Sequence, residues 1–476
     1  MSSTVEGSNP STPVVEIKRL DPSVVNRTSD YPGLPRGTKV LVTEGGAVSK
    51  SVVSQLKAAG CVVTLLQVAR APVASAAAQD FVLVDVSAMS PEACAKAVKG
   101  QDVVVHSGRP QPNASAEMLA EGTRNLLEAA AAAGVKAFVF GSSASVVFGG
   151  QDLKMVSEDE PYPAHFAEPG AASIAEAERA VLTANHSNSN SNGLMVTCSV
   201  RAASVYGPDG CGEKSSSDEL LLIPELALRA KARVRPVGDG KNVVDFVYAG
   251  NVAHALLLAA QALLSKTPAA AATAVAGRAF FVTDMEPVPF AVFAGRALSR
   301  LGYHAPGSAG GGPAGIPVLL ATFLAFVFRV VAMVVSPLFE FRPALTTVRI
   351  AEESAVRRYD TARACKDLGY APLWNQEEAL DIALHGATSL RNPRAKLKYI
   401  GPFTRAEVAR HSSEDDAWII VDGKVHDVTP YLSQHPGGEA ILRNAGGDAS
   451  QGMRGPQHPP QAMEILDQHF IGMLED

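Results

Sequence analysis

The apolar residues of the first three quarters of the chain occur in short runs separated by stretches of helical periodicity. The first run, residues 39–43, is β-branched and leads into a glycine turn and a helical pattern that continues to Gly60. Later apolar runs of strand length alternate with Ala-rich helical stretches. This alternation predicts a parallel sheet with helices on both faces, which is a doubly wound α/β fold. The later runs are residues 61–68, 81–86, 102–106, 137–143 and 194–201.

The opening strand, glycine turn, helix and second strand predict the entry to a Rossmann dinucleotide-binding fold. Thr43 precedes the turn, which offers Gly45 and Gly46, so the pyrophosphate of NAD(P) is expected at the N-terminus of the next helix. Gln67 stands where an acid usually ends the second strand, and it can hydrogen-bond but loses the usual preference for NAD. Glu44 at the front of the turn would bring a carboxylate close to the pyrophosphate, an unfavourable contact between like charges.

A different motif dominates the C-terminal part of the chain, where His435 is followed by Pro-Gly-Gly and a second histidine, His458, lies further along. Two imidazoles at this separation can hold a haem iron from both sides, and the glycines let a flat macrocycle approach the backbone. The chain has no C-x-x-C-H sequence, so the expected cofactor is non-covalent haem b. We interpret His411, His426 and His469 as surface residues. The expected apolar walls are Ile441, Leu442, Met463, Leu466 and Phe470.

Composition and charge distinguish the two regions. The chain has 476 residues, enough for two or more domains, and 19% of them are charged while 47% are hydrophobic. From residue 400 onward 5 Lys and Arg stand against 12 Asp and Glu, a net of −7, whereas the whole chain carries −6, which leaves +1 for the remainder. This acidity would steer a basic redox partner or is a solvated face, and nothing in the sequence indicates nucleic-acid binding.

The cysteines and the N-terminal segment add limits on the cellular setting. Five scattered cysteines form no disulfide framework or metal spacing, which fits a reducing compartment, and they are expected in the core. Residues 1–37 are rich in Ser, Pro, Thr and Asn without a targeting pattern, so they are predicted to be a disordered tail.

Residues 316–339 form an apolar run long enough to span a bilayer, with one charge, Arg329, near its middle. The residues after this run look like the closing strand and helix of the same domain, so both sides of the run must share one compartment. We therefore expect a helix or hairpin that dips into one leaflet, with Pro317 and Pro337 marking its ends. A helix buried in the core of the domain is the alternative.

Beyond position 137 the chain carries the segments GSSASVVFGG, SEDEPYP, ERAVLTAN, GDGKNVVDFVYAGNVAHALLLAA, GRAFFVTDMEPVPF and YDTARACKDLGYAPL. These segments resemble the 3β-hydroxysteroid dehydrogenase family of extended short-chain dehydrogenases, and within it the sterol-4α-carboxylate 3-dehydrogenases (decarboxylating). The resemblance runs, with gaps, from about Lys39 to Leu390. It implies NAD(P)-dependent oxidation of a sterol 3-hydroxyl, after which the 3-keto acid loses its carboxylate, and a location on the cytosolic face of the endoplasmic reticulum membrane.

The resemblance places Ser143 at the family's catalytic serine and Asp85 at the acid on the adenine side of the nucleotide. The family's chemistry also needs a Tyr that deprotonates the hydroxyl and a Lys that lowers the pKa of that Tyr. Counting back from ERAVLTAN, the Tyr position holds Gly170 and the Lys position holds Ile174. Tyr162 does not restore the pair, because the residue four places after it is a phenylalanine.

These losses leave several interpretations of the nucleotide-binding half. A missing general base costs about 10² to 10⁴ in rate. The half is either a competent NAD(P)-dependent dehydrogenase, as the family resemblance implies, or a sterol-binding or scaffold platform that keeps the family's fold. An error or alternative exon over residues 165–180 is a third interpretation.

From about Tyr399 to Asp476 the chain carries PFTRAEVARH, AWIIVDGKVHDVTPYL, HPGG and AGGDAS, which resemble the cytochrome b5 haem-binding domain. This resemblance implies a small α+β fold. With both axial positions filled by histidine, the iron is suited to one-electron transfer. The implied partner is a membrane oxygenase, desaturase or reductase that exchanges electrons with the haem.

The sequence thus predicts a membrane-associated protein of sterol metabolism with a dehydrogenase-like unit and a fused haem domain. The basic linker between them could lie against anionic lipid headgroups. The predicted boundaries are a tail at 1–37, an NAD(P)-binding domain at 38–390 that contains the 316–339 segment, a linker at 391–399 and a haem domain at 400–476.

Overall fold

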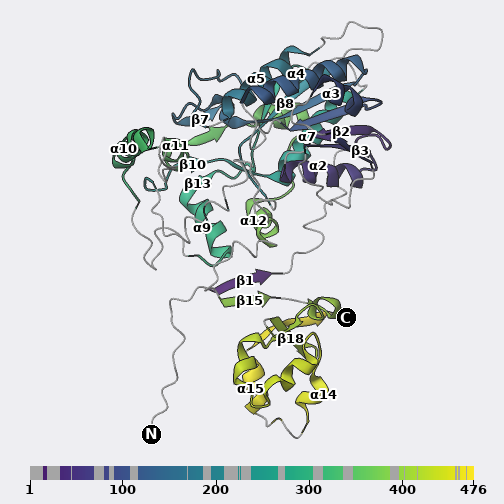
Figure 1. The fold of residues 1–476 in the computed structure, drawn as a ribbon, viewed down its shortest axis with the longest axis vertical. Coiled ribbons are helices and arrows are strands. Elements are labelled where there is room, and N and C mark those ends of the chain that lie inside the picture. The colour runs from purple at the N-terminus through teal and green to yellow at the C-terminus, as the bar shows by residue number, and fades with distance from the viewer. Residues whose placement is uncertain are drawn as a thin grey trace. The chain divides into compact units, whose positions relative to one another are not determined.

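The chain divides into two compact units (Figure 1). The larger unit is Pro22–Arg391, and the smaller unit joins Met1–Asp21 to Asn392–Asp476. The computed structural model describes residues 14–18, 33–43, 46–68, 80–84, 90–107, 116–168, 170–185, 195–207, 223, 226, 237–265, 274–303, 315–335, 347–385, 396–400, 403–414, 416–455, 458, 461–467 and 469–475.

A parallel sheet of seven strands organises the larger unit. Its spatial order is β12-β8-β6-β5-β2-β3-β4, so the direction of strand addition reverses between β2 and β5. Such a switch point is where doubly wound folds bind their ligands, outside the carboxyl ends of the strands. The sheet confirms the predicted α/β class. The strands are β2 (Lys39–Thr43), β3 (Val62–Val68), β4 (Asp80–Val84), β5 (Val103–Ser107), β6 (Ala137–Ser143), β8 (Val196–Ala202) and β12 (Ala279–Val282).

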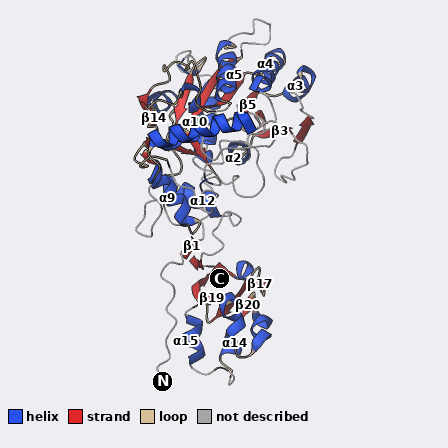
Figure 2. Cartoon of the chain, turned by 60° about the vertical axis from the view of Figure 1, so that its left-hand side comes forward, coloured by secondary structure: helices blue, strands red, loops and turns tan. Residues whose placement is uncertain are grey.

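Helices cover both faces of this sheet (Figure 2). α2 (Ala47–Ala58) packs against α7 (Ala249–Leu264), and α4 (Ala116–Ala132) packs against both α3 (Pro91–Val98) and α5 (Ala171–Thr183). Because helices enclose the sheet on both sides, its central strands carry continuous apolar runs instead of an alternating pattern. The apolar side chains of β2, β5 and β6 are accordingly buried.

A second layer of short strands and helices lies beside the carboxyl ends of the main sheet. Its core includes Phe246 and Phe293, whose rings stack with centroids 3.8 Å apart. The layer consists of a four-stranded sheet, β13-β10-β14-β7, and the pair β9 and β11. The elements are β7 (Leu153–Val156), β9 (Ser204–Tyr206), β10 (Val243–Val244), β11 (Phe246–Tyr248), β13 (Val288–Pro289), α9 (Phe290–Arg300), β14 (Arg357–Tyr359) and α12 (Gln376–His385).

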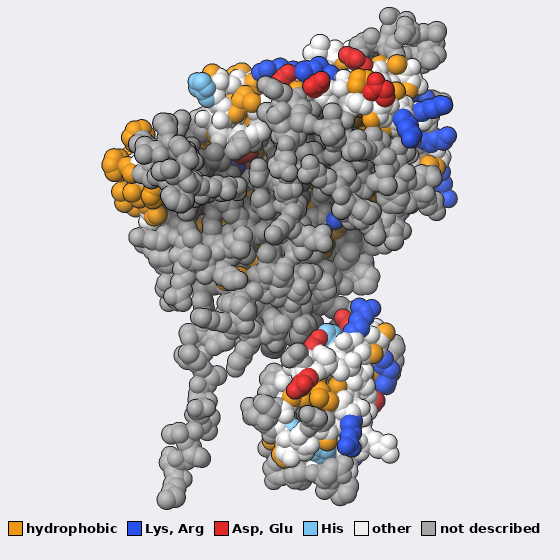
Figure 3. Space-filling view, viewed as in Figure 1, with side chains coloured by type: hydrophobic (Ala, Val, Ile, Leu, Met, Phe, Trp, Pro, Cys, Tyr) orange, Lys and Arg blue, Asp and Glu red, His pale blue; other side chains and the backbone are white. Residues whose placement is uncertain are grey.

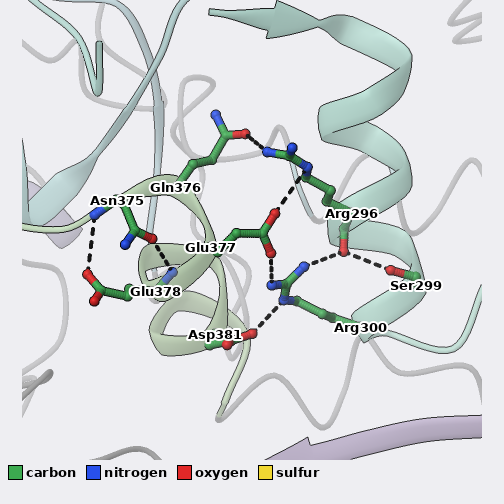
Figure 4. A network of polar contacts seen from close by, with 8 residues as sticks. All are labelled: Arg296, Ser299, Arg300, Asn375, Gln376, Glu377, Glu378 and Asp381. Carbon is green, nitrogen blue, oxygen red and sulfur yellow. Dashed lines mark hydrogen bonds and ion pairs between the residues drawn. The ribbon is translucent and has the colours of Figure 1, made fainter. Parts of the chain in front are cut away.

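Ion pairs hold α9 against α12 (Figure 4). Arg300 Nε donates to Asp381 Oδ1 at 2.6 Å, and Arg300 Nη2 donates to Glu377 Oε2. Arg296 contacts the other oxygen of the same carboxylate at 3.1 Å and donates to Gln376 Oε1 at 2.7 Å. One carboxylate therefore bridges two arginines that lie one turn apart on α9.

Helix α10 (Val318–Val335) occupies most of the predicted membrane-dipping segment. Its inner face is buried, since Ala321 and Ala325 pack in one cluster with Val237 and Ile350 of the larger unit. Its other face is exposed and apolar, as the orange patch over α10 shows (Figure 3). The segment is therefore not a fully buried core helix. Across the described ranges no helix is long and apolar enough to span a membrane. The exposed side chains are Val318, Leu319, Leu320, Phe323 and Phe326.

The smaller unit contains a curved sheet in the order β16-β21-β19-β18-β17, with β20 paired to β18. Trp418, Ile420 and Val425 are buried between this sheet and the opening helix α13 (Arg405–Val408). The remaining elements are β16 (Phe403–Thr404), β17 (Ser412–Ser413), β18 (Asp416–Val421), β19 (Lys424–Asp427), β20 (Gly447–Asp448), α14 (Ser450–Met453), α15 (Gln461–Asp467) and β21 (Phe470–Glu475). This unit confirms the predicted α+β class.

The predicted tail and linker differ from the structure. β1 (Val14–Lys18) pairs in parallel with β15 (Lys396–Ile400), residue by residue over five positions. The prediction of disorder through residue 37 is therefore wrong for this strand, and the linker contributes a strand of its own. Local composition gave no sign of the pairing, because its two partners are almost 400 residues apart.

The cysteines follow the expectation only in part. Cys94 and Cys198 are buried in the core, as predicted. Cys61 is half-buried and Cys365 is exposed, so the core assignment is wrong for Cys365. Cys211 lies outside the described residues.

Candidate functional site

The carboxyl ends of β2 and β5 meet in a buried hydrogen-bonded chain at the switch point. His106 Nδ1 lies 3.0 Å from Thr43 Oγ1, and His106 Nε2 lies 3.0 Å from Thr123 Oγ1. The Thr123 hydroxyl donates its only proton to Leu119 O at 2.7 Å, so His106 must donate through Nε2 and accept at Nδ1. Burial lowers the pKa of His106 to about 3, which keeps the ring neutral. The Thr43 hydroxyl also accepts from the amide of Ser107 at 2.8 Å.

The glycine turn retains one backbone feature of a nucleotide site. Gly46 caps α2 with φ 69° and ψ −137°, a conformation that essentially only glycine adopts. Three residues later Ser49 is buried, and its hydroxyl donates to Thr43 O at 2.8 Å. A serine therefore stands where the third glycine of a G-x-G-x-x-G turn allows close packing of helix and strand.

Several predicted nucleotide contacts cannot be placed. Glu44, Gly45 and Asp85 lie outside the described residues. Gln67 belongs to β3, and the description does not extend to its side chain.

Ser143 ends β6, at the same edge of the sheet as Thr43. It is 8% exposed, and it starts a short 3₁₀ turn (Ala144–Val147) as its N-cap. Its Oγ accepts from the Ser145 amide at 3.2 Å and from the Ser145 hydroxyl at 2.8 Å. The residue at the family's serine position is thus held at the ligand-binding edge by a second serine.

The positions of the missing Tyr and Lys differ from what the family's chemistry needs in backbone conformation as well as in side chain. Gly170 adopts a left-handed conformation, φ 82° and ψ −17°, immediately before α5 begins at Ala171. Ile174 is 4% exposed and packs in the main apolar core. A tyrosine at 170 would be strained in this conformation, and a lysine at 174 would bury its charge among apolar side chains.

Tyr162 is tied into a buried polar network that sequence reasoning missed. Glu178 accepts from Tyr162 OH at 3.2 Å, from Ser142 Oγ at 2.5 Å and from Arg201 Nε at 2.8 Å. Burial and the carboxylate of Glu178 raise the pKa of Tyr162, which is opposite to what a base requires. The only signal in the sequence was a glutamate inside an otherwise apolar helix face, at the position of ERAVLTAN.

The haem-ligand candidates face each other in the smaller unit. The ring centroids of His435 and His458 lie 6.2 Å apart. With a nitrogen–metal bond of about 2 Å and about 1 Å from nitrogen to ring centre on each side, two imidazoles on one metal ion have centres roughly 6 Å apart. His435 Nδ1 lies 3.0 Å from Gly438 O, and His458 Nδ1 lies 3.0 Å from Gly452 O. These carbonyls fix the proton on Nδ1, which leaves Nε2 of each ring free to bind iron.

The residues present therefore fit a haem between the two rings. When held by His435 and His458, the haem iron would supply reversible one-electron transfer. Gly437 is needed beside the first ligand, because a Cβ there would lie 2.9 Å from His435 Cε1. Buried Leu466 and half-buried Ile441 and Leu442 share one apolar cluster.

Other predictions for the smaller unit need correction. His426 is buried, 1% exposed, with Nδ1 2.9 Å from Leu466 O, so its assignment to the surface is wrong. His411 is largely covered because its ring stacks on Trp418 at 3.5 Å. Phe470 lies in strand β21, so the helical spacing expected for it is wrong. Met463 lies in helix α15.

Comparison with known proteins assigns both units. The sequence model described as the 3-beta hydroxysteroid dehydrogenase/isomerase family matches residues 56–309, more than half of the 476 residues. The chain belongs to this family. A second model, the cytochrome b5-like heme/steroid binding domain, matches residues 404–475. The 3-beta hydroxysteroid dehydrogenase family membership and the fused cytochrome b5-like domain agree with the resemblances drawn from the sequence.

Relatives within the 3-beta hydroxysteroid dehydrogenase family are similar over the larger unit. The sterol-4-alpha-carboxylate 3-dehydrogenase, decarboxylating, of Mus musculus is 32% identical over 303 residues, 63% of this chain and 77% of the relative. The 3beta-hydroxysteroid-dehydrogenase/decarboxylase isoform 2 of Arabidopsis thaliana is 33% identical over 60% of this chain and 48% of the relative. Among solved structures, a DesIV double mutant (dTDP-glucose 4,6-dehydratase) of Streptomyces venezuelae with NAD bound superposes with a TM-score of 0.52 at 20% identity, covering 75% of this chain and 99% of that one. The last similarity concerns the fold alone.

Proposed function

We propose that this protein is a membrane-associated electron carrier of sterol metabolism. Its cytochrome b5-like domain would exchange single electrons with a redox partner, and its dehydrogenase-family unit would serve as a sterol-binding platform with impaired hydride chemistry. One contrast carries the proposal. The two haem-ligand rings are oriented by backbone carbonyls at a separation that fits one iron, whereas the positions of the catalytic Tyr and Lys are a left-handed glycine and a buried isoleucine.

The electron-carrier role rests on His435 and His458. With these two histidines as protein ligands of the iron, non-covalent haem b here would carry electrons without activating oxygen. The acidic balance of the C-terminal region, −7 from residue 400 onward, would favour a basic partner surface. A membrane oxygenase, desaturase or reductase that handles sterols is the partner class we propose.

Impairment of the larger unit follows from how it departs from the family's chemistry. Removing a general base costs about 10² to 10⁴ in rate, and the lysine that would lower the pKa of that base is absent as well. Ser143 can hydrogen-bond a sterol oxygen but is not a base that removes its proton. Tyr162 does not supply that base, because its pKa is raised and its hydroxyl donates to Glu178. NAD(P) binding would be weakened by Glu44 near the pyrophosphate and Gln67 in place of an acid.

A slow NAD(P)-dependent sterol 3-dehydrogenase is the second candidate. The geometry at the switch point favours it, since Thr43 and Ser143 lie at the carboxyl ends of their strands and Gly46 begins the helix that follows Thr43. Titration of the chain with NAD⁺ separates the two. Saturable binding together with sterol-dependent absorbance at the nicotinamide band would establish the enzyme and overturn the platform.

Membrane attachment through α10 belongs to the same proposal, with the cytosolic face of the endoplasmic reticulum as its place. Leu319 is 86% exposed, Phe323 62% and Phe326 64%, an apolar face that water disfavours. A helix packed on one side and apolar on the other would lie in the interface of one leaflet. Flotation with phosphatidylcholine vesicles tests this: Phe323→Ser with Phe326→Ser should abolish co-flotation, whereas Val292→Ser, exposed on α9, should not.

The haem assignment has its own test. His458→Ala should release the haem or leave it weakly held, with loss of the low-spin visible spectrum. His411→Ala is the matched control. His411 stacks on Trp418, which belongs to a different apolar cluster from Leu466, so this variant should leave the spectrum unchanged. An unaltered spectrum for His458→Ala would refute the ligand pair.

A further inference from the structure

Strand β1 belongs to the smaller unit, although it precedes the larger unit in the sequence. It pairs in parallel with β15, and β15 in turn lies against β21 of the same unit (Figure 1). The smaller unit therefore consists of Met1–Asp21 together with Asn392–Asp476, and the whole larger unit is inserted between these two segments. The chain consequently connects the two units twice, once before β2 and once after α12.

The register of this pair matches the two sequences at its three central positions. Glu16 is paired with Lys398, an acid opposite a base, and an apolar residue is paired with an apolar residue on either side of it. Opposite charges at directly paired positions favour a register, whereas a slip by one residue would pair Glu16 with an apolar residue. The edge of β15 is thus matched to this particular segment of the chain. The apolar pairs are Val15 with Leu397 and Ile17 with Tyr399.

The parallel direction of the pair keeps the two connections apart. One connection leaves the smaller unit at Lys18, the end of β1, and the other enters it at Lys396, the start of β15. Lys18 is paired with Ile400, whereas Lys396 is paired with Val14, so the two attachment points lie at opposite ends of the ladder. At about 3.3 Å per residue they are about 13 Å apart. An antiparallel pair would have brought them side by side.

The two connections also start from separate places in the larger unit. Leu34, just before β2, is buried in the main apolar core, whereas Leu384, at the end of α12, is buried in the second core with Phe293. After α12, residues 386–395 can span no more than about 40 Å even when fully extended. A unit held by one such connection can still turn about it. A unit held at two separated points cannot turn freely about either.

We propose that β1 is a strap that limits rotation of the smaller unit relative to the larger unit, and that it is fastened by pairing with β15. A pair of short strands is only marginally stable in water, so the strap can open while both units remain folded. A fastened strap restricts the directions from which a redox partner can reach the smaller unit, and an open strap widens them. This inference does not depend on whether the larger unit turns over a sterol.

Hydrogen exchange of the haem-loaded full chain, followed by mass spectrometry over residues 396–400, tests the pairing. Glu16→Pro with Ile17→Pro removes two successive amides, of which one faces β15 because amides alternate along a strand. We expect exchange at 396–400 to accelerate about tenfold or more, since these amides lose their acceptors. Thr4→Pro with Val5→Pro is the matched control outside β1 and should leave the exchange at the wild-type rate.

A charge swap provides a second, milder opening of the strap. Glu16→Lys replaces an opposite-charge pair by two like charges, so exchange at 396–400 should accelerate about two- to fivefold. Lys398→Glu in the same chain restores an opposite-charge pair at this register position and should return the exchange to the wild-type rate. Such a rescue would not occur if Glu16→Lys acted by general destabilisation.

Rotation is measured by pulsed electron paramagnetic resonance between two gadolinium-chelate labels. One label is placed on Cys365, exposed in the larger unit, and the other on Ser413→Cys, exposed in the smaller unit. Cys61→Ser and Cys211→Ser remove the other cysteines that are not shown to be buried. In the proline variant of β1 the distance distribution should broaden by roughly 10 Å, the scale of the lost second attachment. The control prolines and the charge-swapped double variant should keep the wild-type width.

Each outcome supports or overturns the strap. Unchanged exchange at 396–400 in the proline variant overturns it, because β1 then does not protect β15. Faster exchange with an unchanged distance distribution also overturns it, because β1 would then only complete the smaller unit. If the proline variant loses its haem, the charge swap decides: a distribution that broadens in Glu16→Lys and narrows again with Lys398→Glu supports the strap, and one that stays at the wild-type width or is not restored overturns it.

Discussion

Gly437→Ala tests how closely the backbone of the H-P-G-G turn controls the first haem ligand. Gly437 has φ −86° and ψ 7°, which alanine adopts without strain, and the residue is exposed. The folded apo domain should therefore tolerate the change, with a gain of up to about 1 kcal/mol from the reduced entropy of the unfolded chain. The effect of the substitution must then come from the new methyl group.

That methyl group would lie 2.9 Å from Cε1 and 3.3 Å from Nδ1 of His435, whereas ordinary contacts begin at 3.4 Å, so the ring must move by 3.4 − 2.9 = 0.5 Å. The same ring is oriented by its 3.0 Å contact with Gly438 O, which a shift of this size would stretch to the limit of a hydrogen bond. Loss of such an orienting contact typically lowers metal affinity about 10- to 100-fold.

The assay is haem transfer from the loaded protein to an excess of apomyoglobin, followed at the Soret band. Gly437→Ala should accelerate haem loss by about one to two orders of magnitude, with apo-domain stability unchanged or slightly raised. Gly447→Ala is the matched control, since its nearest atom would be Asn444 O at 3.5 Å. Haem loss at the wild-type rate in Gly437→Ala, or equal acceleration in Gly447→Ala, would refute the reasoning.

Three further predictions concern the larger unit. Arg300→Ala removes the contacts with Asp381 and Glu377 and should lower the free energy of unfolding in urea by about 1 kcal/mol. A double-mutant cycle with Asp381→Ala that gives no coupling energy would argue against a stabilising ion pair between α9 and α12. Burial lowers the pKa of His106 from 6.5 to about 3, so the stability that this neutral ring contributes is present above pH 6.5 and is lost as pH falls toward 3. The free energy of unfolding, from urea curves at stepwise pH, should drop by up to a few kcal/mol over this range, and His106→Gln should flatten the dependence on pH. The double variant Gly170→Tyr, Ile174→Lys should not gain sterol dehydrogenase activity, because position 170 is left-handed and 174 lies in the core; NADH formation at a rate at least 100-fold above wild type would contradict this.

Local patterns in the sequence predicted the parallel sheet well. The apolar run at residues 137–143 is β6 residue for residue. Buried parallel strands read as continuous apolar segments, so each is visible without knowledge of its partners. The two histidines that we propose as haem ligands were equally visible, because the Pro-Gly-Gly turn beside His435 lies in the three residues after it.

Features that depend on distant contacts were not predicted. The buried His426 has its hydrogen-bond partner, the carbonyl of Leu466, 40 residues further along the chain. The network around Glu178 joins Ser142, Tyr162 and Arg201 from separate elements. The pairing of β1 with β15 likewise joins residues 14–18 to residues 396–400. In each case the deciding neighbour is far away in sequence, so composition and periodicity carry no information about it.

The backbone conformation at Gly170 could not be predicted from the sequence motifs. Counting along the sequence identified a missing Tyr, but the structure adds that α5 begins only at Ala171 and that the preceding residue is left-handed. The loss therefore involves the helix as well as the side chain. This is the physical reason to expect a platform in place of a slow enzyme.

The most direct test of that claim is a nicotinamide absorbance measurement on the haem-loaded full chain with a 3β-hydroxysterol 4α-carboxylate and saturating NAD⁺ or NADP⁺. We expect no sterol-dependent rise at the reduced nicotinamide band, while the same sample is reduced and reoxidised at its haem by one-electron reagents. A sustained sterol-dependent rise that disappears in Ser143→Ala would contradict it.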